Sequence, residues 1–224
     1  MKGFWVIKMK RTLGLILALT LALGCVFSLT SCKKESAIYG LASSASPTKT
    51  VTLTEYITAD KEYHGEFSME VEGNNSIFYF NYERPASIEE GKADAEAGIT
   101  PNPTKAFEGY IYFKDGKFST DGDTWETEAP TSASFKFDLK PEYLTGASVN
   151  KEDTELTAEL TPENAIKVLG TDLQPSGNVK LTVKTNGVNL TRVVIEYKTA
   201  NGASVRIDTT YTYNPLTLEF PSAE

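Results

Sequence analysis

The sequence predicts a mainly β fold of the β-rich α+β type. We expect a strongly curved antiparallel sheet or half-barrel with one or two short helices on its concave side. Several segments alternate apolar and polar residues with a period of two, which is the period of a strand with one buried face. Three turn dipeptides, Asp115-Gly116, Asn186-Gly187 and Asn201-Gly202, join such segments as β-hairpins do.

The first half of the domain contains several of these predicted strands. Residues 64–71 place Phe67, Met69 and Val71 on one face. Residues 76–82 are apolar at odd and even positions alike, which predicts a strand covered on both sides. Further strands are expected at residues 107–114, 117–120 and 134–139.

An acidic segment with three prolines, residues 84–105, interrupts this pattern. Ser87 and Glu90 have the spacing of a capping box, so a short helix can form there. The segment has almost no apolar face, and we interpret it as a long exposed loop, either disordered or acting as a lid. The alternative is a loop with a specific binding role.

The C-terminal part predicts a strand, a helix and a three-stranded meander. Residues 154–160 alternate, and Thr161 with Pro162 predicts the start of a helix that Gly170 can close. The meander is expected at residues 179–184, 188–198 and 204–213, followed by a short final strand at 216–220.

The first 34 residues have the layout of an export signal. Four basic residues precede an uncharged, Leu-rich run over residues 13–29, and Leu29-Thr30-Ser31-Cys32 follows. This end resembles a bacterial lipoprotein signal with its lipobox. The resemblance implies that residues 1–31 are removed and that Cys32 carries acyl chains such as palmitate. The protein is then extracytoplasmic, lipid-anchored to the bacterial cell membrane, with residues 32–50 as a flexible tether and 51–224 as one domain.

Two alternatives to this N-terminal processing stay open. Cleavage at Cys25 lacks the leucine three residues upstream and leaves apolar residues on the mature chain. An uncleaved anchor is the other alternative, although the 17-residue apolar run is shorter than the roughly 20 residues of a spanning helix.

Charge limits the partners of the exported part. Four of the 22 basic residues and none of the 30 acidic ones precede Cys32, so the remainder carries a formal net charge of −12. This charge is unfavourable for nucleic acid and for anionic lipid headgroups. No cysteine follows Cys32, so the domain has no internal disulfide. The oligomeric state is not determined by these features.

We expect no enzymatic activity, no cofactor and no metal site. His64 is the single histidine and has no ligand-type residue at metal-binding spacing, and no phosphate loop or nucleophile motif is present. Asp121-Gly122-Asp123 matches part of a calcium loop but lacks its closing glutamate, so we interpret it as a turn.

The aromatic residues are the positive functional signal, with 11 Tyr and 11 Phe. One interpretation is that they fill the core of the sheet. The other is that a curved sheet leaves some of them lining a cavity for a lipid or another hydrophobic small molecule. The candidate ligand-binding residues are Phe67, Tyr79, Tyr110, Tyr112, Phe135, Phe137, Tyr197, Tyr211 and Tyr213.

The chain also resembles the LolA/LppX-like lipoproteins. The tail at residues 204–221 resembles their closing motif, and the hairpin from Tyr110 to Trp125 resembles their central unit. The resemblance implies a half-barrel over helices that binds a hydrophobic or amphiphilic ligand, for lipid carriage or envelope sensing. One good amphipathic helix is visible, which is fewer than this picture requires. The alternative is a non-enzymatic surface module that recognises an envelope protein or glycan through exposed aromatic residues or residues 84–105.

Overall fold

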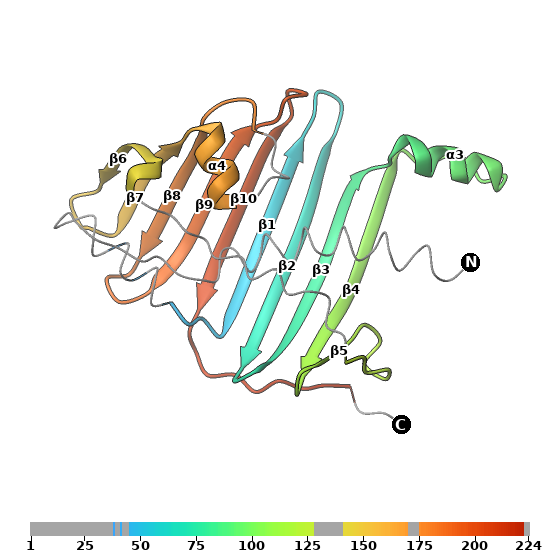
Figure 1. Ribbon diagram of the computed structural model, residues 1–224, viewed down its shortest axis with the longest axis horizontal. Coiled ribbons are helices and arrows are strands. Elements are labelled where there is room, and N and C mark those ends of the chain that lie inside the picture. Colours follow the sequence, from blue (N-terminus) through green and yellow to red (C-terminus); the bar gives the residue numbers. More distant parts are fainter. Residues whose placement is uncertain (1–37, 39–40, 42–44, 128–140, 170–174, 222–224) are drawn as a thin grey trace.

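A single ten-stranded antiparallel sheet dominates the computed structural model (Figure 1), which describes residues 38, 41, 45–127, 141–169 and 175–221. The strand order is β5-β4-β3-β2-β1-β10-β9-β8-β7-β6, and β5 and β6 form the two edges of an open sheet. The strands are β1 (Lys49–Ile57), β2 (Glu62–Glu72), β3 (Asn75–Pro85), β4 (Thr104–Lys114), β5 (Lys117–Ser119), β6 (Leu144–Val149), β7 (Glu155–Leu160), β8 (Val179–Thr185), β9 (Leu190–Lys198) and β10 (Ser204–Thr212). The helical elements are α3 (Ile88–Glu96), a 3-10 turn at Pro141–Tyr143 and α4 (Pro162–Leu169).

The sheet consists of two meanders that meet at one central seam. Strands β1 to β5 form the first meander and β6 to β10 the second, and each strand pairs with its neighbour in the chain. The seam is the pairing of β1 with β10, which runs without interruption from Lys49 opposite Thr212 to Ile57 opposite Ser204. The first and last strands therefore lie in the middle of the sheet.

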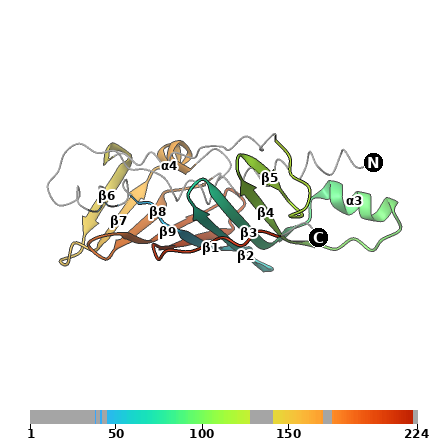
Figure 2. The ribbon, with the colours of Figure 1, turned by 90° about the horizontal axis from the view of Figure 1, so that it is seen from below.

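The sheet is curved, and both of its ends bend toward the side that carries α4 (Figure 2). α4 packs against β7 on this concave side, where Ala165 is fully buried. Its start is capped as the sequence predicts, since the Asn164 amide donates to the Thr161 hydroxyl at 3.3 Å. The predicted class, a curved antiparallel sheet with short helices, is therefore confirmed.

Residues 84–105 differ from the expected long loop. β3 continues to Pro85, β4 begins at Thr104, and Arg84 lies opposite Lys105 in the ladder. Between the strands, α3 extends away from the sheet without any buried residue (Figure 1). The prediction of a long loop is wrong because the strands extend further than their apolar pattern does, whereas the predicted capping box of Ser87 and Glu90 is confirmed.

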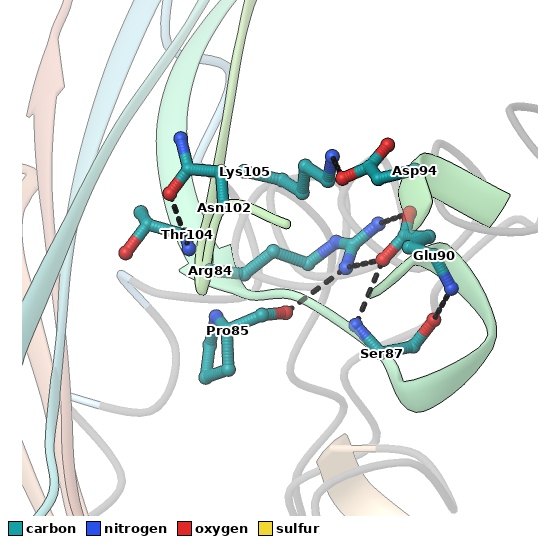
Figure 3. Close-up of polar contacts among 8 residues, drawn as sticks. All are labelled: Arg84, Pro85, Ser87, Glu90, Asp94, Asn102, Thr104 and Lys105. Atoms are coloured by element: carbon teal, nitrogen blue, oxygen red, sulfur yellow. Dashed lines mark hydrogen bonds and ion pairs between the residues drawn. The ribbon is translucent and has the colours of Figure 1, made fainter. Parts of the chain in front are cut away.

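Ion pairs hold α3 against the ends of β3 and β4 (Figure 3). The Arg84 guanidinium donates to both oxygens of Glu90, at 2.8 and 2.7 Å, and Lys105 Nζ lies 2.6 Å from Asp94 Oδ2. Glu90 also accepts from the Ser87 amide at 2.9 Å. These donors, with Arg84 foremost, lower the pKa of the Glu90 carboxyl to about 2.

The three predicted hairpin connections are present, but two of them are longer than a two-residue turn, including the one at Asn201-Gly202, where β9 ends at Lys198 and β10 begins at Ser204. Asp115 and Gly116 have φ values of 52° and 76°, as a type I′ turn requires. The Asn186-Gly187 connection is longer than a two-residue turn: β8 ends at Thr185, β9 begins at Leu190, and the register shifts beside it.

Two expectations at the ends of the domain need correction. Residues 216–220 form no strand; the Leu218 amide instead donates to the Glu72 side chain at 2.9 Å, which fixes this segment against the end of β2. Ile38 is fully buried in the core, and the Thr48 amide donates to the Thr212 carbonyl at 2.9 Å. Residues 32–50 are therefore not a free tether along their whole length. The strand expected at residues 134–139 lies outside the described residues.

Among the helices that the structure describes, none is both long and apolar enough to cross a membrane.

Candidate ligand-binding face

Aromatic rings cover the β2–β5 half of the concave face. Cross-strand partners share a face, so the register brings alternate residues of four strands together. The rings contact one another in a chain, with centroid separations of 5.7 Å from Phe67 to Tyr82 and 5.0 Å from Tyr82 to Phe107. We call these rings, together with Ile111 that packs among them, the aromatic cluster. Its buried members are Phe67, Phe78, Phe80, Tyr82, Ile111 and Phe118.

Two glycines allow these rings to lie close to the sheet. Tyr82 is opposite Gly65, and Phe80 is opposite Gly109. A Cβ on Gly109 would lie 2.9 Å from the tip of the Phe80 ring, and a Cβ on Gly65 would lie 2.9 Å from the Phe67 ring and 2.5 Å from Thr54 Oγ1. The absence of a side chain at each position therefore leaves the room that the neighbouring aromatic ring occupies.

The other half of the concave face is aliphatic. Strands β7 to β10 bury Leu, Val and Ile residues together with Ala165 of α4 and Ile38. The buried strand residues of this aliphatic cluster are Leu156, Leu160, Val179, Leu181, Val183, Leu190, Val193, Ile195, Ile207 and Tyr211. This half has the composition of an ordinary core.

A polar patch lies at the seam between the two clusters. Thr52 and Thr209 are opposite each other, both fully buried, and their hydroxyls are hydrogen-bonded at 2.8 Å. Thr50 is opposite Tyr211, so Tyr213 is its diagonal neighbour on the same face. The Thr50 and Tyr213 hydroxyl oxygens are buried and have no hydrogen-bond partner in the described structure. We call Thr50, Thr52, Thr209 and Tyr213 the hydroxyl patch.

Four of the nine predicted ligand-binding residues lie on the concave side. Phe67 belongs to the aromatic cluster and Tyr211 to the aliphatic cluster, with Tyr197 and Tyr213 packed at its margin. Burial raises the pKa of both Tyr197 and Tyr213, because an ionised phenolate is poorly solvated there. These tyrosines are therefore neutral hydrogen-bonding groups.

Three of the nine lie on the opposite, convex face, which differs from the expectation. Tyr79 is opposite Tyr110 in the ladder, and Tyr112 follows two residues later on the same side. Their rings form a row, with centroids 5.0 Å apart for Tyr79 and Tyr110 and 5.9 Å apart for Tyr110 and Tyr112. The physical reason is strict alternation: the concave positions of β3 are taken by Phe78, Phe80 and Tyr82. Phe135 and Phe137 lie outside the described residues.

The same alternation overturns the expectation that β3 is covered on both sides. On its convex face, Tyr110 of the neighbouring strand is 47% exposed, and the Tyr79 hydroxyl donates to Glu108 at 3.2 Å. The convex side of β3 is thus a partly exposed aromatic surface.

Sequence reasoning missed the threonines of the hydroxyl patch. Residues 50–54 alternate Thr with Val51 and Leu53, and the alternation alone suggests that the aliphatic residues face inward. The structure has the reverse, since Leu53 is 51% exposed while Thr50 and Thr52 are buried. The inward orientation of these threonines follows from the register of β1 against β10. A short stretch of sequence contains no information on that register.

The acidic and metal-type residues are arranged as structural groups. Asp121 closes its turn by accepting from the Thr124 amide at 2.8 Å and the Asp123 amide at 2.9 Å, and these bonds lower its pKa to about 2. His64 is exposed, 3.5 Å from Glu62. In the part of the chain that the structure describes, no three His, Cys, Asp or Glu side chains gather as a metal site.

Comparisons with known proteins give structural matches only. No protein-family model matches the chain, and no curated protein matches it. A LolA superfamily protein from Nitrosomonas europaea is similar at 10% identity and a TM-score of 0.33, over 84% of this chain and 96% of that one. A hypothetical protein from Chlamydia trachomatis is similar at 10% identity and a TM-score of 0.35, over 88% and 100%.

The family suggested by the sequence resemblance is thus represented among these structural matches. TM-scores below 0.5 carry no information on a ligand. The function of this chain is therefore inferred from its own residues.

Proposed function

We propose that this chain is a bacterial lipoprotein, anchored through Cys32, whose domain binds an amphiphilic ligand on its concave face. The apolar part of the ligand lies on the aromatic cluster and its polar group meets the hydroxyl patch. This assignment is supported by the mainly apolar composition of the concave face and by the buried hydroxyl groups at the central seam.

The observation that carries the proposal is the pair of buried hydroxyls at Thr50 and Tyr213. A buried hydroxyl without a partner costs about 1–3 kcal/mol, so native proteins rarely keep one without a use. Two such groups as diagonal neighbours next to a set of aromatic rings match a ligand that is apolar along its length and carries an acceptor at one end.

The Thr52–Thr209 pair adds to this capacity. One hydrogen bond between two hydroxyls uses one of their two hydrogens. The second hydrogen is available to a carbonyl, carboxylate or ether oxygen. A fatty acid or a lysolipid carries such acceptors, whereas a pure hydrocarbon offers none. An amphiphile therefore fits the patch better than a hydrocarbon does.

Ligand binding can be tested by native mass spectrometry of the full chain purified from a bacterial host, followed by titration with oleate and lysophosphatidylcholine. The combined variant Thr50→Val, Tyr213→Phe keeps the shape of both side chains and removes both hydroxyls. We expect this variant to bind oleate roughly tenfold more weakly and to be about 1 kcal/mol or more stable to urea, because two unpaired buried groups are gone. The matched control is Tyr110→Phe on the convex face, which should leave binding unchanged.

Two results would contradict the proposal. One is wild-type protein that carries no lipid and binds neither probe. The other is an unchanged oleate affinity in the double variant, which would remove the hydroxyl patch from the binding site.

The anchor is tested separately, through the mature N-terminus. We expect mass spectrometry to find a chain that starts at Cys32 with acyl chains attached, and Cys32→Ala to leave the precursor uncleaved. Two acyl chains suffice for stable anchoring. A mature protein that retains Met1, or starts at an unmodified residue, would refute the anchor and leave the ligand site untouched.

A further inference from the structure

The outer edge of β4 is largely unpaired in the described structure. β3 pairs with β4 continuously from Thr104 to Phe113, whereas on the other side β5 reaches only Tyr112, Phe113 and Lys114. Residues 104–111 therefore form a margin of the sheet, visible beside α3 in Figure 1. This margin is about 25 Å long, and alternate residues direct their N–H and C=O groups outward along it.

This margin lacks the proline and the bulge that protect many edge strands against strand addition. Natural edge strands are blunted by proline, by bulges, by being short or by charged side chains, and of these devices residues 104–111 have only the charged side chains Lys105 and Glu108. Residues 104–111 contain no proline, and the pairing of β4 with β3 has no register shift. The opposite edge is protected in the expected way, because β6 has a bulge between Thr145 and Ser148 with Gly146 at a φ of 61°.

The convex side of the margin is negatively charged. Glu66, Asn81 and Glu108 form one row across β2, β3 and β4, and Glu108 ends it at the edge. Neither glutamate forms an ion pair in the described residues. Lys61 lies at the Thr104 end of this side and is already paired with Glu83 at 3.7 Å, while Arg84 and Lys105 belong to the concave side and are bound to carboxylates of α3 (Figure 3). A basic side chain opposite Glu108 would extend the row with an opposite charge.

The concave side of the margin is apolar from Phe107 to Ile111, and Lys105 lies at its end, where it is paired with Asp94. Gly109 has no side chain there, and the tip of the Phe80 ring lies over it. Phe107 and Ile111 flank this position on the same face. A residue placed opposite Gly109 would therefore contact the Phe80 ring, which favours an apolar side chain.

We propose that the edge of β4 at residues 104–111 binds an extended peptide segment of another protein by β-strand addition. The segment alternates basic and apolar residues, with a basic residue opposite Glu108 and an apolar residue opposite Gly109. Backbone hydrogen bonds supply affinity, and the two faces select the sequence. This site is separate from the concave ligand face, so a negative result here would leave the proposed function unaffected, and the reverse also holds.

The test uses the full chain and a fluorescein-labelled probe of eight residues that alternates Lys and Val. We expect saturable binding by fluorescence anisotropy, together with amide hydrogen-exchange protection confined to residues 104–111. A peptide that alternates Glu and Val can form the same backbone hydrogen bonds and carries the opposite charge. We expect it to bind at least tenfold more weakly.

Two protein variants locate the site. Glu108→Lys places a like charge opposite each basic residue of the probe and should weaken binding roughly three- to tenfold. Glu55→Lys makes the same change in net charge on the convex face of β1, three strands away, and should have little effect because salt screens that separation.

Several results would overturn the proposal. They are a lack of protection at residues 104–111 on binding, equal affinity for the two peptides, and equal effects of Glu108→Lys and Glu55→Lys. Protection of the outward-directed amides of residues 104–111 before any peptide is added would also overturn it, because it means that the edge is already occupied. Native mass spectrometry of the peptide-free protein would then show whether a second copy of this chain is the occupant.

Discussion

The hydrogen bond between Thr52 and Thr209 offers the sharpest test of the central seam. Both side chains are fully buried, and their hydroxyl oxygens are 2.8 Å apart on opposite strands. Valine has nearly the shape of threonine without the hydroxyl. Thr52→Val or Thr209→Val alone therefore leaves one buried hydroxyl without its partner, at a cost of about 1–3 kcal/mol.

The double replacement behaves differently because it removes both polar groups at once. We expect its free energy of unfolding to lie within about 1 kcal/mol of the wild-type value. The two single changes should then be non-additive, with a coupling energy of about 1–2 kcal/mol. Urea unfolding monitored by circular dichroism can measure these differences in the free energy of unfolding, since about 2 kcal/mol corresponds to a midpoint shift of roughly 1 M.

Two results would contradict a dry, hydrogen-bonded seam. If each single variant unfolds at the wild-type midpoint, the hydroxyls are hydrated and the seam is not dry. If the double variant loses the sum of the two single losses, the two threonines act independently and the hydrogen bond is not formed in solution.

Three further predictions concern other parts of the sheet. Gly65→Ala should destabilise the domain by about 1–3 kcal/mol in urea unfolding, because the new methyl group meets close neighbours, whereas Gly177→Ala, with open space around it, should not. The hydrogen-exchange protection factors of the α3 amides, taken relative to the intrinsic exchange rate at each pH, should decrease as the pH falls from about 5 to 2. The fold lowers the pKa of Glu90, so its contribution to the stability of α3 is complete above the ordinary pKa of 4.5. This contribution is lost as the carboxyl protonates toward pH 2. Glu90→Gln should remove this pH dependence. Asp208→Ala should lower the free energy of unfolding by about 1–2 kcal/mol in urea or thermal unfolding. The reason is that Arg192 and Arg206 both lose the Asp208 carboxylate that they share, and this side chain is only 12% exposed.

Local sequence signals predicted most of the fold. The turn at Asp115-Gly116, the helix start at Thr161 and the meander of β8 to β10 all depend on residues close together in the chain. Such features are set by backbone geometry and capping chemistry, which a short window contains. The general class of a curved antiparallel sheet follows from them.

The candidate site was predicted less well, because it depends on contacts between distant segments. Apolar residues fill both faces of β3, so its alternation did not reveal which side faces the interior, and Tyr79 and Tyr110 were assigned to the wrong face. The hydroxyl patch exists only because β1 meets β10, about 150 residues later in the chain. No pattern within either strand identifies that partner.

The seam between the first and last strands also determines when this protein can finish folding during synthesis. β1 emerges first and can pair with β2 at once, but its second partner is the last strand to be made. Until then β1 keeps an open edge, and a chain cut short before Ser204 never closes it. Pairing across such a separation must also overcome the entropy of a long loop, which makes it slow. A chain that lacks β10 is therefore left with β1 as an open edge of the β1–β5 meander and without its link to the second meander, a form that we expect to aggregate or be degraded.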